Sequence, residues 1–210
     1  MLFHLLDALL GTTTKVRVLR ALFPLTSPVS GSEARRLARV RSAESMWASL
    51  DELTDLGILS REETRGSHLY RVNREHDLAA PLEALFAAEA RRLSRLRDEL
   101  RTLLSDAGLL DSTRSVLLYG SNARGETTAK SDIDLLVVTE GEETVPAVRD
   151  ALLAGAPALR ERFGWRISPY VLPRERVEAR HREGDPLMET IAEEGRVLLG
   201  DPLQEVASAR

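Results

Sequence analysis

Apolar side chains recur at helical spacing through the first part of the chain. Residues 13–23 place Val16 and Leu19 on one face of a helix, which Pro24 ends. Two further helices are predicted over residues 33–40 and 43–57. Gly57 ends the last of them, as a glycine after the final apolar position commonly does. The first part of the chain therefore predicts three successive helices.

The pattern then changes to strand-like runs. ILSREE and HLYRVN, at residues 58–63 and 68–73, are joined by TRGS, which is a hairpin signal. Three helices followed by a hairpin is the element order of a winged helix-turn-helix domain. The sequence of residues 50–78, LDELTDLGILSREETRGSHLYRVNREHDL, resembles the recognition helix and wing of the ArsR and MarR-like bacterial regulators. This resemblance implies a DNA-binding winged helix domain at residues 1–75.

A long helical pattern follows. Residues 78–104 predict one continuous helix, the main part of a linker over residues 76–110. Leucines recur along it at spacings of three and four, with an interruption at Glu89: Leu82, Leu85, Leu93, Leu96, Leu100 and Leu103. Such a stripe packs either on a flanking domain or on the same helix of a second subunit. Because winged helix proteins usually read two half-sites, a homodimer is one expected assembly.

Residues 111–210 alternate short apolar strands with helical stretches. The strands are predicted over residues 115–120, 132–138, 165–172 and 196–200. A helix is predicted over residues 145–163, and one or two more precede the last strand. The predicted fold class is α+β in several domains: a winged helix-turn-helix, a long linker helix and a mixed-sheet α/β domain.

Composition narrows the class of protein. The chain has no cysteine, which excludes disulfides and cysteine-ligated zinc. Its apolar runs are shorter than the roughly 18 residues of a membrane span, and its start lacks a signal-peptide pattern, so we expect a cytoplasmic protein without membrane contact. Residues 1–75 carry 11 basic and 9 acidic side chains, whereas residues 111–210 carry 13 and 18. This asymmetry indicates two different tasks.

Two carboxylates stand at the start of an apolar strand. Asp132 and Asp134 are separated by one residue, so in an extended strand they project to the same side. Two half-buried carboxylates this close repel one another and call for a cation. Mg²⁺ or Mn²⁺ is the expected partner, because these ions prefer oxygen ligands and leave positions open for phosphate oxygens.

A glycine-serine turn lies eleven residues before this carboxylate pair. Gly120 and Ser121 follow a short apolar strand and precede a helix expected to begin near Asn122, an arrangement suited to phosphate. Glu126 stands where a P-loop requires lysine, which excludes that motif. The candidate residues for binding a nucleoside triphosphate are Gly120, Ser121, Arg124, Lys130 and Ser131.

The combination resembles the DNA polymerase β-like nucleotidyltransferase superfamily, in particular its minimal members and their fusions behind a winged helix. Tyr119-Gly120-Ser121 followed by Asp132-Ile133-Asp134-Leu135 matches the superfamily signature hG[GS] and Dh[DE]h. The resemblance implies transfer of a nucleoside monophosphate from a triphosphate, with Asp132 and Asp134 as catalytic residues and metal ligands.

The resemblance also implies a third carboxylate on a later strand. The strand at residues 165–172 contains no acid and has Ser168 and Tyr170 on one face. Nucleotide binding is therefore better supported than catalysis. Two interpretations stay open: an enzyme that transfers a nucleotide to an unknown acceptor, and a DNA-binding regulator whose nucleotidyltransferase-like domain senses nucleotide or scaffolds a dimer. An antitoxin-like protein paired with a toxin is a third.

DNA binding would depend on basic residues outside the recognition helix. That helix carries Glu44, Asp51, Glu52 and Asp55 and no basic residue. The candidate phosphate contacts are Arg35, Arg36, Arg39, Arg41, Arg61, Arg65 and Arg71. The alternative is that these arginines form a solvated face of a dimerisation or protein-docking module.

Overall fold

The computed structural model describes residues 9–64, 66–124 and 131–208. The chain divides into two units, Met1–Arg92 and Leu93–Arg210. The boundary falls inside the segment expected to be a linker, between helix α5 (Ala79–Ala90) and helix α6 (Arg92–Asp106). In the described residues no helix is long and apolar enough to cross a membrane.

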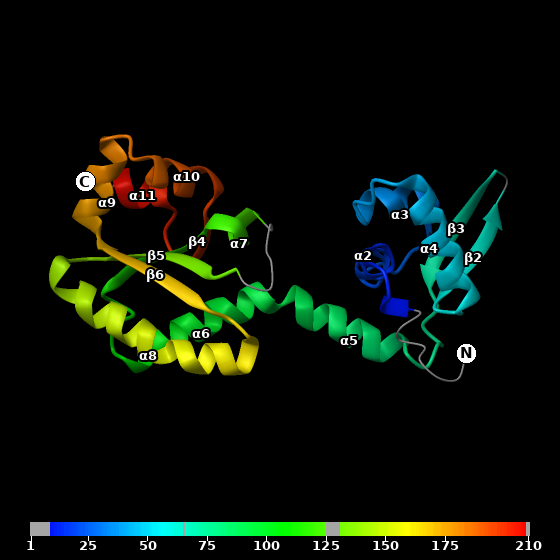
Figure 1. Ribbon diagram of the computed structural model, residues 1–210, viewed down its shortest axis with the longest axis horizontal. Helices are drawn as coiled ribbons and strands as arrows, with labels where there is room; N and C mark the ends of the chain where they lie inside the picture. The colour runs from blue at the N-terminus through cyan, green and yellow to red at the C-terminus, as the bar shows by residue number, and fades with distance from the viewer. Residues whose placement is uncertain (1–8, 65, 125–130, 209–210) are drawn as a thin grey trace. The chain divides into compact units, whose positions relative to one another are not determined.

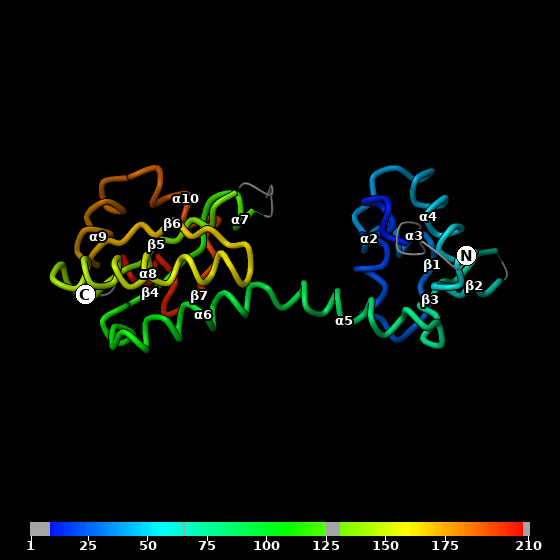
Figure 2. Tube along the Cα trace, turned by 60° about the horizontal axis from the view of Figure 1, so that its bottom comes forward, coloured from blue at the N-terminus to red at the C-terminus, as the bar shows by residue number. Residues whose placement is uncertain are grey.

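The first unit combines helices with a small sheet (Figure 1). Its other elements are α2 (Thr13–Leu22), β1 (Val29–Ser30), α3 (Gly31–Leu37), α4 (Ala43–Asp55), β2 (Leu59–Thr64) and β3 (Ser67–Val72). The three-stranded sheet has the order β1-β3-β2, with antiparallel pairing throughout. The predicted hairpin is thus confirmed, whereas the two-residue strand β1, seen beside β3 in Figure 2, carries no sequence pattern that predicts it.

The helices of this unit share one core. Leu19 of α2 and Leu50 and Leu53 of α4 are fully buried. The spacing of three residues between Leu50 and Leu53 places both side chains on the same face of α4. Serine and threonine side chains begin the helices: Thr12 accepts from the Lys15 amide, Ser30 from Glu33 and Ser42 from Ser45.

The predicted single helix over residues 78–104 is wrong. Two helices occupy this segment, and Arg91 lies between them with φ −82° and ψ 1°. Leu82 packs in the core of the first unit, whereas Leu96 and Leu100 pack in the core of the second. The leucine stripe is interrupted at Glu89, two residues before Arg91, but it resumes at Leu93, so the pattern by itself still predicts one helix.

The second unit is built on a four-stranded sheet with helices on both faces (Figure 1). Its further elements are β4 (Thr113–Tyr119), α7 (Gly120–Arg124), β5 (Ile133–Thr139), the 3₁₀ turn η1 (Glu142–Thr144), α8 (Val145–Phe163), β6 (Ile167–Pro173), α9 (Arg174–Arg182), α10 (Pro186–Glu194), β7 (Arg196–Gly200) and α11 (Leu203–Ser208). The strand order is β6-β5-β4-β7. β5 and β6 are parallel and the other pairs antiparallel, so the predicted mixed sheet is confirmed.

The two faces of the sheet have separate cores. Leu135 and Val137 of β5 pack with α6 and α8, whereas Leu136 and Val138 pack with α9, α10 and α11. A strand buried on both faces reads as an uninterrupted apolar run, which is the pattern LLVV of β5. Asp134, in the first part of β5, and Asp132, just before the strand, are therefore polar residues at the end of an otherwise apolar strand.

Candidate functional site

The pairing of β4 with β5 brings the glycine-serine turn against Asp134. Tyr119, the last residue of β4, lies opposite Asp134 in the antiparallel register, and Gly120 follows it. Gly120 has φ +71°, and a Cβ added there would lie 2.5 Å from Oδ2 of Asp134. Glycine is therefore needed both for the left-handed backbone and for the close approach of the carboxylate.

Burial and charge both act on the Asp134 carboxylate. Its half-buried position raises the pKa of Asp134 above the ordinary range, and the negative charge of Asp132 raises it further. Within the described part of the chain, the Asp134 side chain makes no hydrogen bond or ion pair. A carboxylate in this position is stabilised in its charged form by a cation.

Asp132 lies just before β5 and is exposed. Its carbonyl oxygen accepts a hydrogen bond from the side-chain amide of Asn122 on α7 (2.6 Å), and the Ile133 amide donates to the Arg166 carbonyl (2.7 Å). The Asp132 carboxylate is 3.8 Å from Nε of Arg166, a long ion pair. These contacts fix the backbone that carries the two carboxylates. Asn122 was not among the predicted site residues, although it follows Gly120-Ser121 directly.

The other predicted nucleotide-binding residues have different surroundings. Ser121 is half-buried on α7, and Ser131 directly precedes Asp132. Arg124 is exposed and forms an ion pair with Glu194 of α10, with 3.2 Å between Nη1 and Oε2. Lys130 lies outside the described residues. The structure thus brings Gly120 beside Asp134, with Ser121 next to it on α7, whereas Arg124 forms an ion pair with an acid.

Ser168 occupies the position on β6 that lies beside Asp134. The two residues are in register in the parallel pairing of β5 with β6, and Ser168 is exposed. Residues in register project to the same face of a sheet, so Tyr119, Asp134 and Ser168 form one row. In the described residues, no group of three or more His, Asp or Glu side chains is placed to hold a metal ion.

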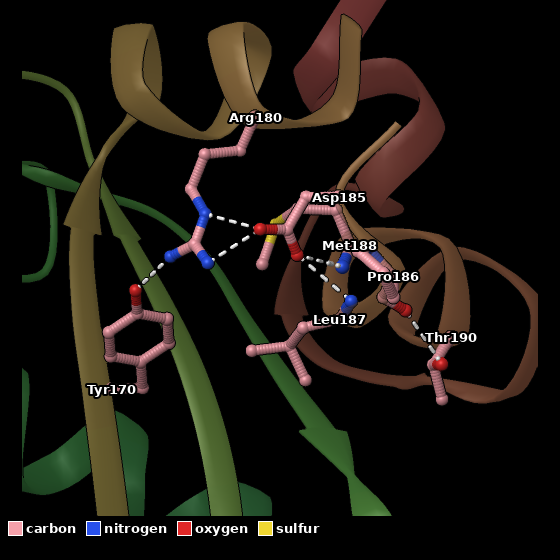
Figure 3. Close-up of polar contacts among 7 residues, drawn as sticks. All are labelled: Tyr170, Arg180, Asp185, Pro186, Leu187, Met188 and Thr190. Atoms are coloured by element: carbon pink, nitrogen blue, oxygen red, sulfur yellow. Dashed lines mark hydrogen bonds and ion pairs between the residues drawn. The ribbon is translucent and has the colours of Figure 1, made fainter. Parts of the chain in front are cut away.

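Two tyrosines stand on the same face as Asp134. Burial raises the pKa of Tyr119, and the nearby Asp134 and Tyr170 raise it further, so Tyr119 stays a neutral phenol. The Tyr170 hydroxyl accepts a hydrogen bond from Arg180 of α9, whose Nε and Nη2 donate to one carboxylate oxygen of Asp185 at 2.9 and 2.6 Å (Figure 3). This network holds the Tyr170 ring on the sheet.

The same network caps helix α10. The second Asp185 oxygen accepts from the amides of Leu187 (2.9 Å) and Met188 (3.2 Å) (Figure 3). The hydrogen bonds from Arg180 lower the pKa of Asp185, followed by those from the two amides. The sequence pattern Asp-Pro at residues 185–186 is typical of a helix start, but its link to Tyr170 depends on tertiary packing.

Asp132 is one of the residues that line an open cleft of about 730 Å³. Its wall includes Leu153 and Pro157 of α8, and Arg160 and Arg166 stand at the same cleft. Trp165 also lines it, and its ring stacks on Phe163 with centroids 4.2 Å apart. Asp132 therefore belongs both to the carboxylate pair and to the lining of this cleft.

The arginines predicted to contact DNA divide into two groups. Arg35 donates to the carbonyls of Val40 and Arg41, Arg36 contacts Glu33 at 3.4 Å, and wing residues Arg61 and Arg71 form ion pairs with Asp51 and Glu62. Arg39 and Arg41 are exposed, and in the described residues they have no ion-pair partner. Arg65 lies outside the described residues.

Comparison with known proteins gives one family. The model of the nucleotidyltransferase domain family matches residues 93–197, which include α6 and extend to β7. No curated protein matches the chain. Among solved structures, the chain is similar to a crystal structure of a toxin-antitoxin with AMP-PNP, at 16% identity and a TM-score of 0.34, over 53% of this chain and 80% of that one.

The raised pKa of Asp134 predicts how stability depends on pH in metal-free protein. The folded state keeps this proton to a higher pH than the unfolded chain, so the free energy of unfolding falls as pH rises from the ordinary carboxyl range through the raised pKa. Asp134→Asn should remove this part of the fall and be more stable than wild type at neutral pH.

Urea unfolding in EDTA across the acidic to neutral range measures this effect. Asp150→Asn, on the exposed face of α8, is the matched control and should follow the wild-type profile. Wild-type and Asp134→Asn profiles that run parallel would show that Asp134 is not the group responsible.

Proposed function

Because the chain belongs to the nucleotidyltransferase domain family, which residues 93–197 match, we propose that its second unit binds a nucleoside triphosphate with Mg²⁺ or Mn²⁺ and transfers the nucleoside monophosphate. The acceptor hydroxyl releases its proton to solvent and its oxygen forms a bond to the α-phosphorus, while the bond from the α-phosphorus to the oxygen bridging to the β-phosphorus breaks and pyrophosphate leaves. The observation that carries this proposal is the Asp132 and Asp134 pair beside the backbone of Gly120.

The donor set at this pair fits a hard divalent cation. Both side chains offer carboxylate oxygens, and the raised pKa of Asp134 indicates a site where a positive charge is favourable. Asp132 and Asp134 would hold the ion, which when bound would neutralise charge on the triphosphate. Gly120 keeps the space beside Asp134 free of a side chain.

The chain's own residues would divide the remaining work. Ser121 lies on α7 next to Gly120, where its hydroxyl and amide would face a phosphate group, and Ser131 lies next to Asp132. Arg124 and Lys130 complete the proposed nucleotide set, Arg124 by exchanging Glu194 for a phosphate. Tyr119, kept neutral, is a hydrogen-bond donor on the same face.

The cleft lined by Asp132 is the proposed acceptor site. Because Asp132 is part of its lining, an acceptor bound there would lie beside the carboxylate pair. Leu153, Pro157 and Trp165 provide apolar contact, and Arg160 and Arg166 provide hydrogen-bond donors. A hydroxyl on a partly apolar molecule suits this lining better than a free sugar does.

Ser168 stands where the superfamily resemblance implies a third catalytic carboxylate, and its presence there is expected to slow the transfer reaction. A hydroxyl cannot supply the negative charge of the third carboxylate that the superfamily resemblance implies. Two carboxylates suffice for one ion held together with a triphosphate, and a second ion would bind weakly. We therefore propose tight nucleotide binding with slow transfer.

A second candidate function is a DNA-binding regulator, favoured by the element order of the first unit. The succession α2, α3, α4 and the β2–β3 hairpin is that of a winged helix, and Arg39 and Arg41 are exposed. In this proposal the nucleotidyltransferase domain reports nucleotide to the DNA-binding domain, and a homodimer reads two half-sites. Leu85 of α5, 55% exposed, is the one large apolar side chain of the predicted leucine stripe that is left for a dimer contact in the described residues.

Removal of both carboxylates tests the nucleotide site. Asp132→Asn with Asp134→Asn should weaken Mg²⁺-dependent ATP binding by roughly 100-fold or more, since losing a residue that only supports a metal ligand already weakens metal affinity about 10–100-fold. The fold should persist. Glu142→Gln with Asp150→Asn removes two exposed acids elsewhere and is the control in isothermal titration calorimetry. Unchanged ATP affinity in the first variant would refute the site.

Restoration of a third carboxylate tests the role of Ser168. Ser168→Asp should destabilise the protein in EDTA, because three carboxylates then repel, and stabilise it again when Mn²⁺ is added. Pyrophosphate release with ATP and Mn²⁺ should increase relative to wild type. Ser168→Asn, which has the same shape without the charge, should show neither effect. Equal Mn²⁺ stabilisation in the two variants would contradict the proposal.

A further inference from the structure

Helix α3 ends with an arginine in a backbone conformation that favours glycine. Its C-cap is Ala38, and the next residue, Arg39, has φ +51°. The Arg39 amide donates to the Arg36 carbonyl (3.2 Å) and the Val40 amide to the Arg35 carbonyl (3.2 Å), which is the Schellman pattern of helix ends. A residue other than glycine in the left-handed conformation destabilises the folded state, so arginine at this position is unusual and indicates a role for its side chain.

In the part of the chain that the structure describes, the same ending recurs three times with glycine. Helices α4, α6 and α9 each end with the two corresponding hydrogen bonds, and the left-handed residue is Gly57, Gly108 and Gly184 respectively. Among the described residues, Arg39 is the one side chain held at positive φ. Arg39 thus stands at a position that helices α4, α6 and α9 give to glycine, and its neighbours Arg35, Arg36 and Arg41 are also basic.

Arg35 holds this turn in place. Its Nε donates to the Val40 carbonyl (3.2 Å) and its Nη2 to the Arg41 carbonyl (2.8 Å). These two bonds tie the backbone that follows Arg39 back to helix α3 and so hold the turn that carries Arg39 and Arg41. Arg35, one of the predicted DNA contacts, therefore has a positioning role and is not itself free to bind phosphate.

Two adjoining clefts lie on this turn, and both are lined by Arg39 and Arg41. One, of about 760 Å³, continues over α2 to Arg17, and the other, of about 490 Å³, continues along α3 to Arg36. Neither lining contains an acidic residue. Arg20, at the rim of the first cleft, is paired with Glu89. Arg17, Arg39 and Arg41 are exposed and have no ion-pair partner within the described ranges.

We propose that this α2–α3 surface, formed by Arg17, Arg39 and Arg41, binds the phosphodiester backbone of a nucleic acid. The inference rests on the proposed DNA binding of the first unit. It assigns the phosphate contacts to this surface and not to the wing arginines. A surface of two joined clefts with shared arginines suits a row of phosphates better than a single one. Helix α4 is acidic along its length, and the wing arginines Arg61 and Arg71 are neutralised by Asp51 and Glu62.

Two double variants of the full chain, with equal changes in charge, test the assignment. Arg39→Gly with Arg41→Gln removes charge from the α2–α3 surface, and Arg61→Gln with Arg71→Gln removes it from the wing. The readout is fluorescence anisotropy of a labelled random-sequence duplex over a series of salt concentrations. The first variant should flatten the slope of log affinity against log salt by about two, roughly one for each lost phosphate contact. The second should leave the slope unchanged.

The substitution Arg39→Gly removes the charge without being expected to destabilise the fold, so a loss of affinity cannot be attributed to unfolding. Glycine adopts the left-handed conformation without strain, so its thermal midpoint should equal or exceed that of wild type while affinity falls. A flatter slope in the wing variant, with no change in the variant of Arg39 and Arg41, would overturn the assignment of the phosphate contacts to the α2–α3 surface. It would leave the proposed DNA binding of the first unit intact. Wild-type protein with no salt-dependent duplex affinity would overturn the proposed DNA binding itself. Binding of ATP to the α2–α3 surface in its place would show a single-nucleotide site and overturn the inference.

Discussion

The close approach of the Asp134 carboxylate to the backbone of Gly120 is the constraint on which the site depends. It is produced by the antiparallel register of β4 and β5, which places Tyr119 opposite Asp134 and the turn directly after it. Any side chain at residue 120 would displace the carboxylate. A half-buried acid is thereby kept next to a second acid, in surroundings that disfavour its charge unless a cation is present.

The surrounding elements hold that constraint in place. Apolar residues on both faces of β5 bury the strand, and its register matters because a shift by one residue would turn Asp134 to the other face of the sheet. Asn122 ties α7 to the Asp132 backbone, and Arg180 links Tyr170 to the start of α10 through Asp185. The site is therefore a rigid strand end with one short helix. Ser168 stands where the superfamily resemblance implies a third carboxylate, so the site has one negative charge fewer than that resemblance implies.

Much of the second unit could be predicted from local patterns, because glycine, paired aspartates and apolar runs have direct conformational meaning. Gly120, Ser121, Asp132 and Asp134 were predicted as one site, and the structure places them at neighbouring strand ends. The leucine stripe is interrupted at Glu89, but this does not by itself predict the helix end at Arg91, because Leu82 and Leu96 fit one helical pattern and differ in the core that receives them. The short strand β1 likewise exists only through its pairing with β3.

Charge was the least predictable property. The predicted DNA-contacting arginines look alike in the sequence, yet Arg35 clamps a turn, Arg61 and Arg71 are paired with acids, and Arg39 and Arg41 stay exposed. Each of these outcomes depends on residues brought close by folding, which spacing along the chain does not encode. The same reason hides the contact of Arg124 with Glu194, seventy residues apart.

The number of metal ions bound with nucleotide tests the central claim most directly. Electron paramagnetic resonance titration of Mn²⁺ into the full chain, with a saturating non-hydrolysable ATP analogue, counts the tightly bound ions. Two carboxylates without a third predict one tight Mn²⁺ per chain, which binds far more weakly when the nucleotide is left out. No tight ion, or nucleotide affinity that is the same with and without Mn²⁺, would contradict the account.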